Sequence, residues 1–330
     1  MQLCRKVQYI MLDSKQKKVL FLRFSSLGDI INANCDAMQI KKMHPEFSLT
    51  WMTDSIYADI IKLQPWVDGV IEWDRKNTGN RGFYKILQNV RHMGFDILVD
   101  MHATDRSSIF SLFSGIKQRY AIHYHFPFAH TEIGLKGLLG SSYNISKYQV
   151  YLCAPPVGKD TAKVLDDNSC KKLGLAIGAS SVVKRWPIRQ WIKFCRLASD
   201  SGYDMFLMGN GAEEVKIAEE ITSSLSSQHI VNLVNRTSII ELIAVTAKMN
   251  AVVAGDTGLM HIARALGIPV AGLFGPNYPM IGDEYMKSLG ICYFCNCPEK
   301  GCQKKECTRQ CLEDIDALTV FEGVCQLLGD

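Results

Sequence analysis

The amino-acid sequence predicts an α/β protein made of two Rossmann-like, doubly wound domains, and three observations support this. Its 330 residues exceed the usual span of one core, at about 150 residues per domain. Short apolar runs alternate with amphipathic segments of helical length, a pattern typical of βαβ units and parallel sheets. A polar, proline-containing stretch at 153–172 interrupts the pattern, which then restarts. We therefore expect domains at 1–160 and 161–330, with the carboxyl ends of both sets of strands facing a central cleft.

The first domain is expected to begin with a strand and a helix. The strand is KVLFLRF, and the helix runs from about Asp29 to Met43, with Asp29 as a suitable N-cap. Further strands are expected at SLTWMT, GVIEW, FDILVDM and KQRYAIH.

The second domain repeats the alternation with well-marked helices. Its expected strands are LGLAIG, YDMFLMG, IVNLV, NAVVAG and PVAGLFG. In the helix near 189–201, the buried stripe is expected to be Trp191, Phe194, Cys195 and Ala198. Before the helix at 239, Ser238 and Glu241 have the spacing of a capping box. These apolar stripes are interpreted as core.

Composition and charge exclude several classes. The net charge of +4 is too mild for nucleic acid as the main partner, although it suits an anionic substrate or peripheral contact with an anionic membrane face. The sequence has no run of roughly 18 apolar residues and no export signal. We therefore expect a cytoplasmic protein whose 12 cysteines are reduced.

The segment VVAGDTGLMHIARALGIPVAGLFGP contains the strongest site signal. Its strand is expected to end at Gly255, and Asp256 is expected to open the following helix as its N-cap. Thr257 and His261 lie one turn apart, beside the first backbone N–H groups of the helix. A helix N-terminus with a glycine, a hydroxyl and an imidazole suits a phosphate or diphosphate, so Thr257, Gly258 and His261 are candidate ligands of one, and Asp256 belongs to the same candidate nucleotide-sugar site.

Other polar residues follow strands of the second domain. Ser180, Ser181 and Lys184 come after the LGLAIG run, where Lys184 either solvates the loop or places its ammonium against a departing diphosphate. Glu213 follows the FLMGNG segment and either accepts hydrogen bonds from a ribose or simply favours the start of its helix.

The segments RFSSLGDII and GDTGLMHIARALGIPVAGLFGP, with KRWP between them, resemble glycosyltransferase family 9, the ADP-heptose heptosyltransferases of lipopolysaccharide core assembly. The likeness runs from about Lys18 to the C-terminus. It implies a GT-B fold and an inverting transfer that uses no catalytic metal or other cofactor. Its acceptor is bound by the first domain and its nucleotide sugar by the second.

The resemblance also assigns roles. It implies that Asp29, the aspartate of the S-S-x-G-D loop, is the general base, and that Lys184 with the Asp256 loop holds the diphosphate. Glu213 would approach the ribose and Thr237 the adenine, although the family often has methionine at the latter position. Ser26, Gly28 and Arg106 would contact the acceptor. Near Arg106, His102 stands where the family has a glutamine.

A cluster of cysteines near the C-terminus leaves two interpretations open. Four thiolates, from Cys292, Cys295, Cys307 and Cys311, could bind Zn or Fe as a structural ion. Some relatives of the resembled family that glycosylate proteins have an iron-binding cysteine finger. The alternative is a set of reduced thiols packed around a loop.

Three function hypotheses follow. The leading one, which the resemblance implies, is heptosyl transfer from ADP-heptose to a lipopolysaccharide inner-core or lipid A–Kdo acceptor at the inner face of the inner membrane. The second keeps the donor but gives a protein acceptor, such as an autotransporter. The third is a non-catalytic nucleotide-sugar binding module, which would have no use for the base Asp29. An NAD-dependent dehydrogenase is disfavoured because no G-x-G-x-x-G follows the first strand.

Overall fold

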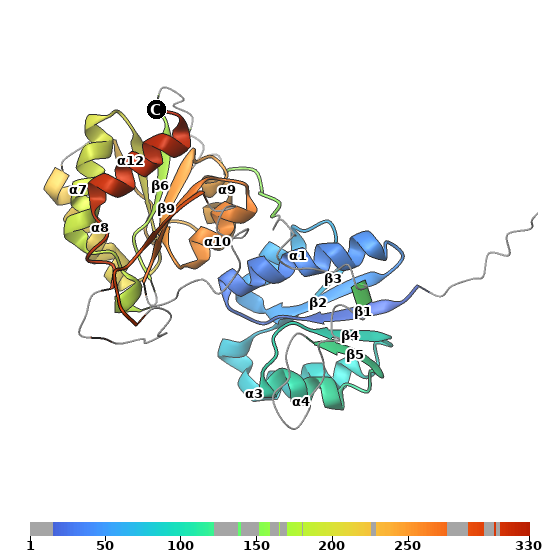
Figure 1. Cartoon of the computed structure of the whole chain (residues 1–330). Helices are drawn as coiled ribbons and strands as arrows, with labels where there is room; N and C mark the ends of the chain where they lie inside the picture. The colour runs from blue at the N-terminus through green and yellow to red at the C-terminus, as the bar shows by residue number, and fades with distance from the viewer. Residues whose placement is uncertain are drawn as a thin grey trace, which may run out of the picture.

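The computed structural model contains two parallel β-sheets with helices on both faces, as the sequence predicts (Figure 1). It describes residues 16–121, 138–139, 152–158, 165, 170–179, 181–225, 229–275, 290–299, 307 and 311–330. The first sheet is formed by residues before 122, and the second by residues after 171.

The first sheet has five parallel strands in the order β3-β2-β1-β4-β5. Its chain order reverses between β1 and β4, which is where ligands of doubly wound sheets bind. Its elements are β1 (Lys18–Leu22), α1 (Leu27–Met43), β2 (Ser48–Asp54), η1 (Ser55–Tyr57), α2 (Ala58–Lys62), β3 (Gly69–Trp73), α3 (Arg75–Val90), β4 (Ile97–Asp100), α4 (Asp105–Phe113) and β5 (Gln118–Ala121).

The second sheet has six parallel strands in the order β11-β10-β9-β6-β7-β8, and its order reverses between β6 and β9. Its elements are β6 (Lys172–Ala176), η3 (Val182–Lys184), α7 (Ile188–Asp200), β7 (Asp204–Met208), α8 (Ala212–Leu225), β8 (Ile230–Asn232), α9 (Ile239–Thr246), β9 (Ala251–Gly255), α10 (Gly258–Ala265), β10 (Val270–Phe274), β11 (Gly290–Phe294) and α12 (Ala317–Leu328).

The central strands of the second sheet are nearly continuous apolar runs. All residues of β6, β9 and β10 are buried, as expected where helices cover each side of a parallel sheet. The predicted stripe of α7 is confirmed, since Trp191, Phe194, Cys195 and Ala198 are its buried residues. The capping box of α9 is confirmed as well, because Ser238 accepts from the Glu241 N–H while Glu241 accepts from the Ser238 N–H.

No helix in the described part of the chain is both long and apolar enough to cross a membrane. The helix α1, for example, has 17 residues but carries Asp29, Asp36, Lys41 and Lys42.

Candidate functional site

The loop that leaves β1 folds into an N-terminal cap of α1. The helix begins at Leu27 rather than at Asp29, so Ser26 is the N-cap and Asp29 lies in the first turn. The Asp29 Oδ2 accepts hydrogen bonds from the backbone N–H and the hydroxyl of Ser26, at 3.1 and 2.9 Å. The predicted N-cap role of Asp29 is therefore wrong, because Ser26 provides the capping position and Asp29 completes a capping box.

Arg23 fixes the Asp29 carboxylate from the strand side. Its Nη2 lies 2.7 Å from Asp29 Oδ2, and its Nη1 donates to the carbonyl of Met101 at the end of β4. Burial raises the pKa of Asp29, but the Arg23 charge and the Ser26 hydrogen bonds outweigh it and hold that pKa below its ordinary value. The side chain still has 49% of its surface exposed. Asp29 is thus an ionised, oriented carboxylate that a ligand can reach.

The end of β4 contributes a buried polar group beside Arg23. Asp100 Oδ1 accepts the backbone N–H groups of His102 and Ala103, at 2.9 and 3.0 Å. Burial and the Arg23 charge lower the pKa of His102 to about 4, so its imidazole is neutral at neutral pH. A neutral imidazole donates and accepts hydrogen bonds as an amide does, which suits the position where the resembled family has glutamine. Arg106 is exposed, and its guanidinium lies 5.3 Å from the ring centre of Trp73.

The loop after β9 supplies the other half of the site. The helix α10 begins at Gly258 with Thr257 as its N-cap, so the prediction that Asp256 caps it is wrong. Asp256 instead accepts from Lys184 Nζ at 2.7 Å and lies 3.8 Å from His261 Nε2. The Thr257 hydroxyl oxygen is buried, with no hydrogen-bond partner among the described residues. Lys184, Thr257 and His261 therefore converge at one helix N-terminus, as the sequence predicts.

The other donor-side residues that were predicted and that the structure describes follow the carboxyl ends of β6, β7 and β8. Ser181 is the N-cap of η3, which ends at Lys184. Ser180 lies outside the described residues. Thr237 lies in the loop before α9, next to the N-cap Ser238. Glu213 points outward with 54% of its side chain exposed and pairs with Lys216 at 3.1 Å.

Sequence analysis missed Glu214, which lies closer to the strand ends than Glu213. Glu214 is only 9% exposed, and no described residue forms a hydrogen bond or ion pair with its carboxylate. A Cβ on Gly178 would lie 2.2 Å from its Oε1, and one on Gly211 would lie 2.5 Å from its Oε2. The glycines at these loop positions thus leave room for the carboxylate. The signal was present in the sequence, because Glu214 shares the buried face of α8 with Ile217, Ala218 and Ile221.

Two close approaches bring the halves of the site together. A Cβ on Gly28 would lie 2.6 Å from His261 Cδ2, and one on Gly258 would lie 2.6 Å from Leu27 Cδ2. The N-termini of α1 and α10 therefore meet through glycines, and the two helices contact each other, with α10 next to one end of α1 in Figure 1. Behind this contact lies a shared apolar cluster, whose buried members are Ile31, Cys35, Ile60, Leu152, Ile243, Ile262 and Ala265. Asp29, next to Gly28, is consequently held beside the candidate diphosphate site.

The cysteine-rich segment does not assemble the predicted ligands. Cys292 packs in the core cluster of Phe274, whereas Cys295 and Cys311 pack with Val183. Alternation along β11 and its extension turns Cys292 and Cys295 to opposite faces, because they are three residues apart. Cys307 is exposed. Within the described ranges, no three of these four thiols come within the 4.8 Å that a shared ion would require. The predicted set therefore does not fit a bound ion in this structure.

Comparisons with known proteins show which family the chain is similar to. Residues 143–313, more than half of the chain, match the model of "Glycosyltransferase family 9 (heptosyltransferase)". The lipopolysaccharide core heptosyltransferase OpsX of Haemophilus influenzae is 26% identical over 284 residues, covering 80% of each chain.

Solved structures share the fold over nearly the whole chain. A family 9 glycosyl transferase from Veillonella parvula superposes with a TM-score of 0.82 at 17% identity, covering 95% of this chain and 97% of that one. The E. coli heptosyltransferase WaaC, solved with ADP, has a TM-score of 0.71 at 17% identity, covering 94% and 99%. The fold is therefore GT-B, as predicted. With the family match over more than half of its length, the chain belongs to glycosyltransferase family 9, the heptosyltransferases, and is a transferase.

Proposed function

We propose that the protein transfers a heptosyl group from ADP-heptose to an acceptor of the lipopolysaccharide inner core, with inversion at the anomeric carbon. The contact of Gly28 with His261 carries the proposal, because it sets an oriented carboxylate beside an anion-binding helix N-terminus. The relative OpsX is a lipopolysaccharide core heptosyltransferase, and WaaC was solved with ADP. These relatives support both the donor and the acceptor class.

On the donor side, we assign the diphosphate to the N-terminus of α10. The first N–H groups of that helix, the Lys184 ammonium and the His261 ring offer donors to one anion. Asp256 acts as a positioning residue, since it holds Lys184 at 2.7 Å and would repel a diphosphate that touched it. Ser181 and Thr257 place hydroxyl groups along the same edge, and the sequence offers Ser180 as a further candidate. The ammonium stabilises the negative charge that ADP gains as the bond to the sugar breaks.

On the acceptor side, Asp29 acts as the general base. As the acceptor hydroxyl oxygen attacks the anomeric carbon, its proton passes to Asp29, while the bonding electrons of the departing oxygen remain with ADP. Arg23 and Ser26 keep the carboxylate ionised and oriented before the acceptor arrives. Arg106 lies in the first turn of α4, the helix that follows β4, and its guanidinium is exposed. We assign it to an anionic group of the acceptor. Gly28 lets this loop approach the donor site.

We assign the ribose hydroxyls to Glu214 rather than to Glu213. Its nearly buried carboxylate at the strand ends gains hydrogen-bond donors when a ribose binds, which offsets the cost of burying the charge. Glu214→Gln is expected to weaken ADP binding about tenfold, because a charge-assisted hydrogen bond becomes neutral. Isothermal titration with ADP measures this. The adjacent Glu213→Gln is the matched control, and equal losses in both variants would refute the assignment.

The proposed reaction is tested by ADP release. The purified protein is incubated with ADP-heptose and a truncated lipopolysaccharide that ends either at the Kdo sugars of lipid A or at the first core heptose. We expect it to release ADP and to increase the mass of that acceptor by one heptosyl group. Mass spectrometry of the acceptor and a coupled ADP assay provide the readouts. If ADP is released only when a protein acceptor is present, the reaction is instead the heptosylation of a protein. Tight ADP-heptose binding with no turnover on any acceptor would indicate a binding module.

A further inference from the structure

The amino ends of three neighbouring strands gather a thiol, a carboxyl group and an imidazole. Cys170 precedes β6, Asp204 opens β7, and His229 precedes β8. Each offers one ligand atom, and these three atoms all lie within 4.8 Å of one another. The His229 Nδ1 is 2.9 Å from Asp204 Oδ1. This group takes no part in the proposed transfer and involves none of the cysteines near the C-terminus.

The sheet itself sets this spacing. Asp204 donates its backbone N–H to the Lys171 carbonyl at 2.9 Å, and Met205 donates to the His229 carbonyl at 2.7 Å. These hydrogen bonds hold the segments that carry Cys170, Asp204 and His229 side by side, in the strand order β6-β7-β8. The three side chains therefore project from backbone that the ladder already fixes, which is the preorganisation that a metal site needs.

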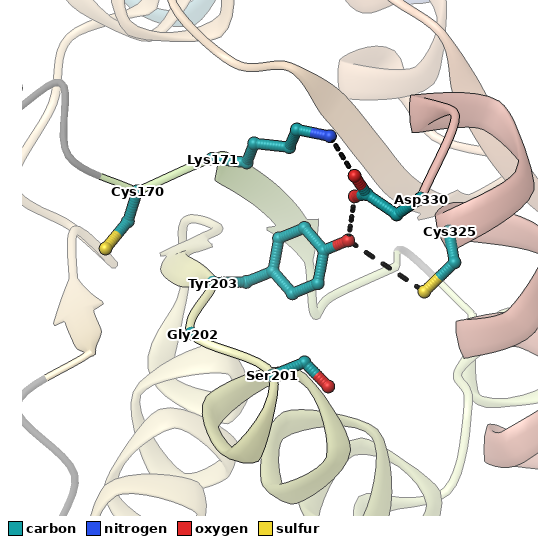
Figure 2. Close-up of a pocket in the computed structure, with 7 residues that line it drawn as sticks. All are labelled: Cys170, Lys171, Ser201, Gly202, Tyr203, Cys325 and Asp330. Carbon is teal, nitrogen blue, oxygen red and sulfur yellow. Dashed lines mark hydrogen bonds and ion pairs between the residues drawn. The ribbon is translucent and has the colours of Figure 1, made fainter.

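The group is reachable from solvent, because the His229 and Asp204 side chains are 26% and 20% exposed. Cys170 lines a pocket of about 370 Å³ together with Tyr203 and the C-terminal residue Asp330. Figure 2 shows the Cys170 side chain directed away from Asp330, whereas Lys171 extends toward it and forms an ion pair with it. The Lys171 charge is thus neutralised on the other side of the strand. Nothing in this arrangement places its ammonium among the three ligand atoms.

We propose that Cys170, Asp204 and His229 bind one Zn²⁺ ion. Thiolate, imidazole and carboxylate are the ligand types of zinc, and a sulfur ligand disfavours the hard ions Mg²⁺ and Ca²⁺. Binding replaces the thiol proton of Cys170 by the metal and releases that proton to solvent. Water completes a four-coordinate site. The ion ties together three strand ends that are otherwise joined by backbone hydrogen bonds and by the pairing of His229 with Asp204.

The role of this site is structural. The carboxyl ends of the same strands carry the transferase site, and a five-residue strand such as β7 spans about 16 Å at roughly 3.3 Å per residue. The zinc site therefore lies at the opposite edge of the sheet from the nucleotide. Its loss is expected to lower thermal stability and to leave turnover of the folded enzyme unchanged. The inference is consequently independent of the proposed reaction.

Metal analysis of the whole chain tests the proposal. Protein loaded with Zn²⁺ and then desalted is expected to retain one equivalent more than Cys170→Ser or His229→Gln treated in the same way. With Co²⁺ in place of Zn²⁺, the wild type should show a thiolate-to-cobalt charge-transfer band that Cys170→Ser lacks. A chelator should lower the melting temperature of the wild type but not that of His229→Gln.

Cys325→Ser is the matched control, since Cys325 lines the same pocket but is not part of the group. Cys325→Ser should retain as much zinc as the wild type. Any zinc bound by other cysteines is present in every variant, so it does not change the difference in zinc content between them. Circular dichroism establishes that each variant is folded, and Asp204→Asn provides a further ligand variant if one is not. Equal zinc content in wild type, Cys170→Ser and His229→Gln would overturn the proposal.

Discussion

Replacing Asp29 by asparagine is expected to lower kcat by about 10²- to 10⁴-fold, the usual contribution of a positioned general base. The amide oxygen of asparagine can still accept a hydrogen bond from Ser26, so the cap of α1 is kept, but the side chain no longer takes the acceptor proton. ADP binding should be unchanged, because the diphosphate is held by α10 and Lys184. Steady-state kinetics and titration with ADP measure the two quantities separately.

Asp59→Asn is the matched control for that variant. Asp59 also lies in the first turn of a helix and pairs with a cation, Lys62, at 3.1 Å, but its side chain is 74% exposed and pairs with none of the described residues of the proposed site. It should retain wild-type kcat. A fully active Asp29→Asn enzyme would show that the proton goes elsewhere.

The pH profile gives the same prediction a second readout. Because Arg23 helps to hold the pKa of Asp29 below its ordinary value, activity should persist to acidic pH and fall only as Asp29 becomes protonated. Arg23→Met removes the charge that favours the ionised form, so the pKa of Asp29 rises and the acidic limb moves to higher pH. An unmoved limb in Arg23→Met would mean that Asp29 does not control it.

Much of the fold was predictable because parallel sheets leave a strong pattern. Strands buried on both faces appear as apolar runs, and β6, β9 and β10 do so. The candidate site was predictable for a related reason. In such sheets every strand delivers its carboxyl end to the same edge, so a polar residue that follows a strand is already placed near the others. This rule led to the loops that carry Lys184 and His261, whereas the role of Asp29 was implied by the resemblance to the family, and all three roles stay predictions.

Local roles were less predictable, because tertiary partners decide them. Both Ser26 and Asp29 can cap a helix, and the sequence alone does not reveal that Arg23 pairs with the latter. Asp256 leaves the capping position because Lys184, 72 residues earlier, pairs with its carboxylate. Glu214 was detectable from helical periodicity, but the glycines that accommodate it come from two separate strand ends.

Spacing was least informative for metal ligands. The cysteine run near the C-terminus has close spacing, yet strand alternation separates Cys292 from Cys295. Conversely, Cys170, Asp204 and His229 are spread over three segments and form no motif. Only the pairing of β6, β7 and β8 brings them together. A ligand set that depends on strand order cannot be recognised before that order is known.

Removing the charge of Lys184 is the second change for which a large loss is expected. Lys184→Gln should lower kcat/KM by about 10²- to 10³-fold, the range for loss of one donor at a site of developing charge. Most of the loss should appear in kcat, because the ammonium meets more negative charge as ADP departs than in bound ADP-heptose. Lys184→Arg should recover part of it, since the charge is kept but its geometry changes.

Lys193→Gln separates this effect from the simple loss of an ion pair. Lys193 pairs with Asp316 at 2.7 Å, the same distance as between Lys184 and Asp256, but between α7 and the start of α12. If ion pairing alone mattered, the two glutamine variants would lose similar stability and similar activity. We expect Lys193→Gln to keep wild-type kcat/KM. If Lys184→Gln keeps the wild-type kcat, Lys184 does not stabilise the transition state. The departing diphosphate would then be held by the N–H groups of α10 and by His261.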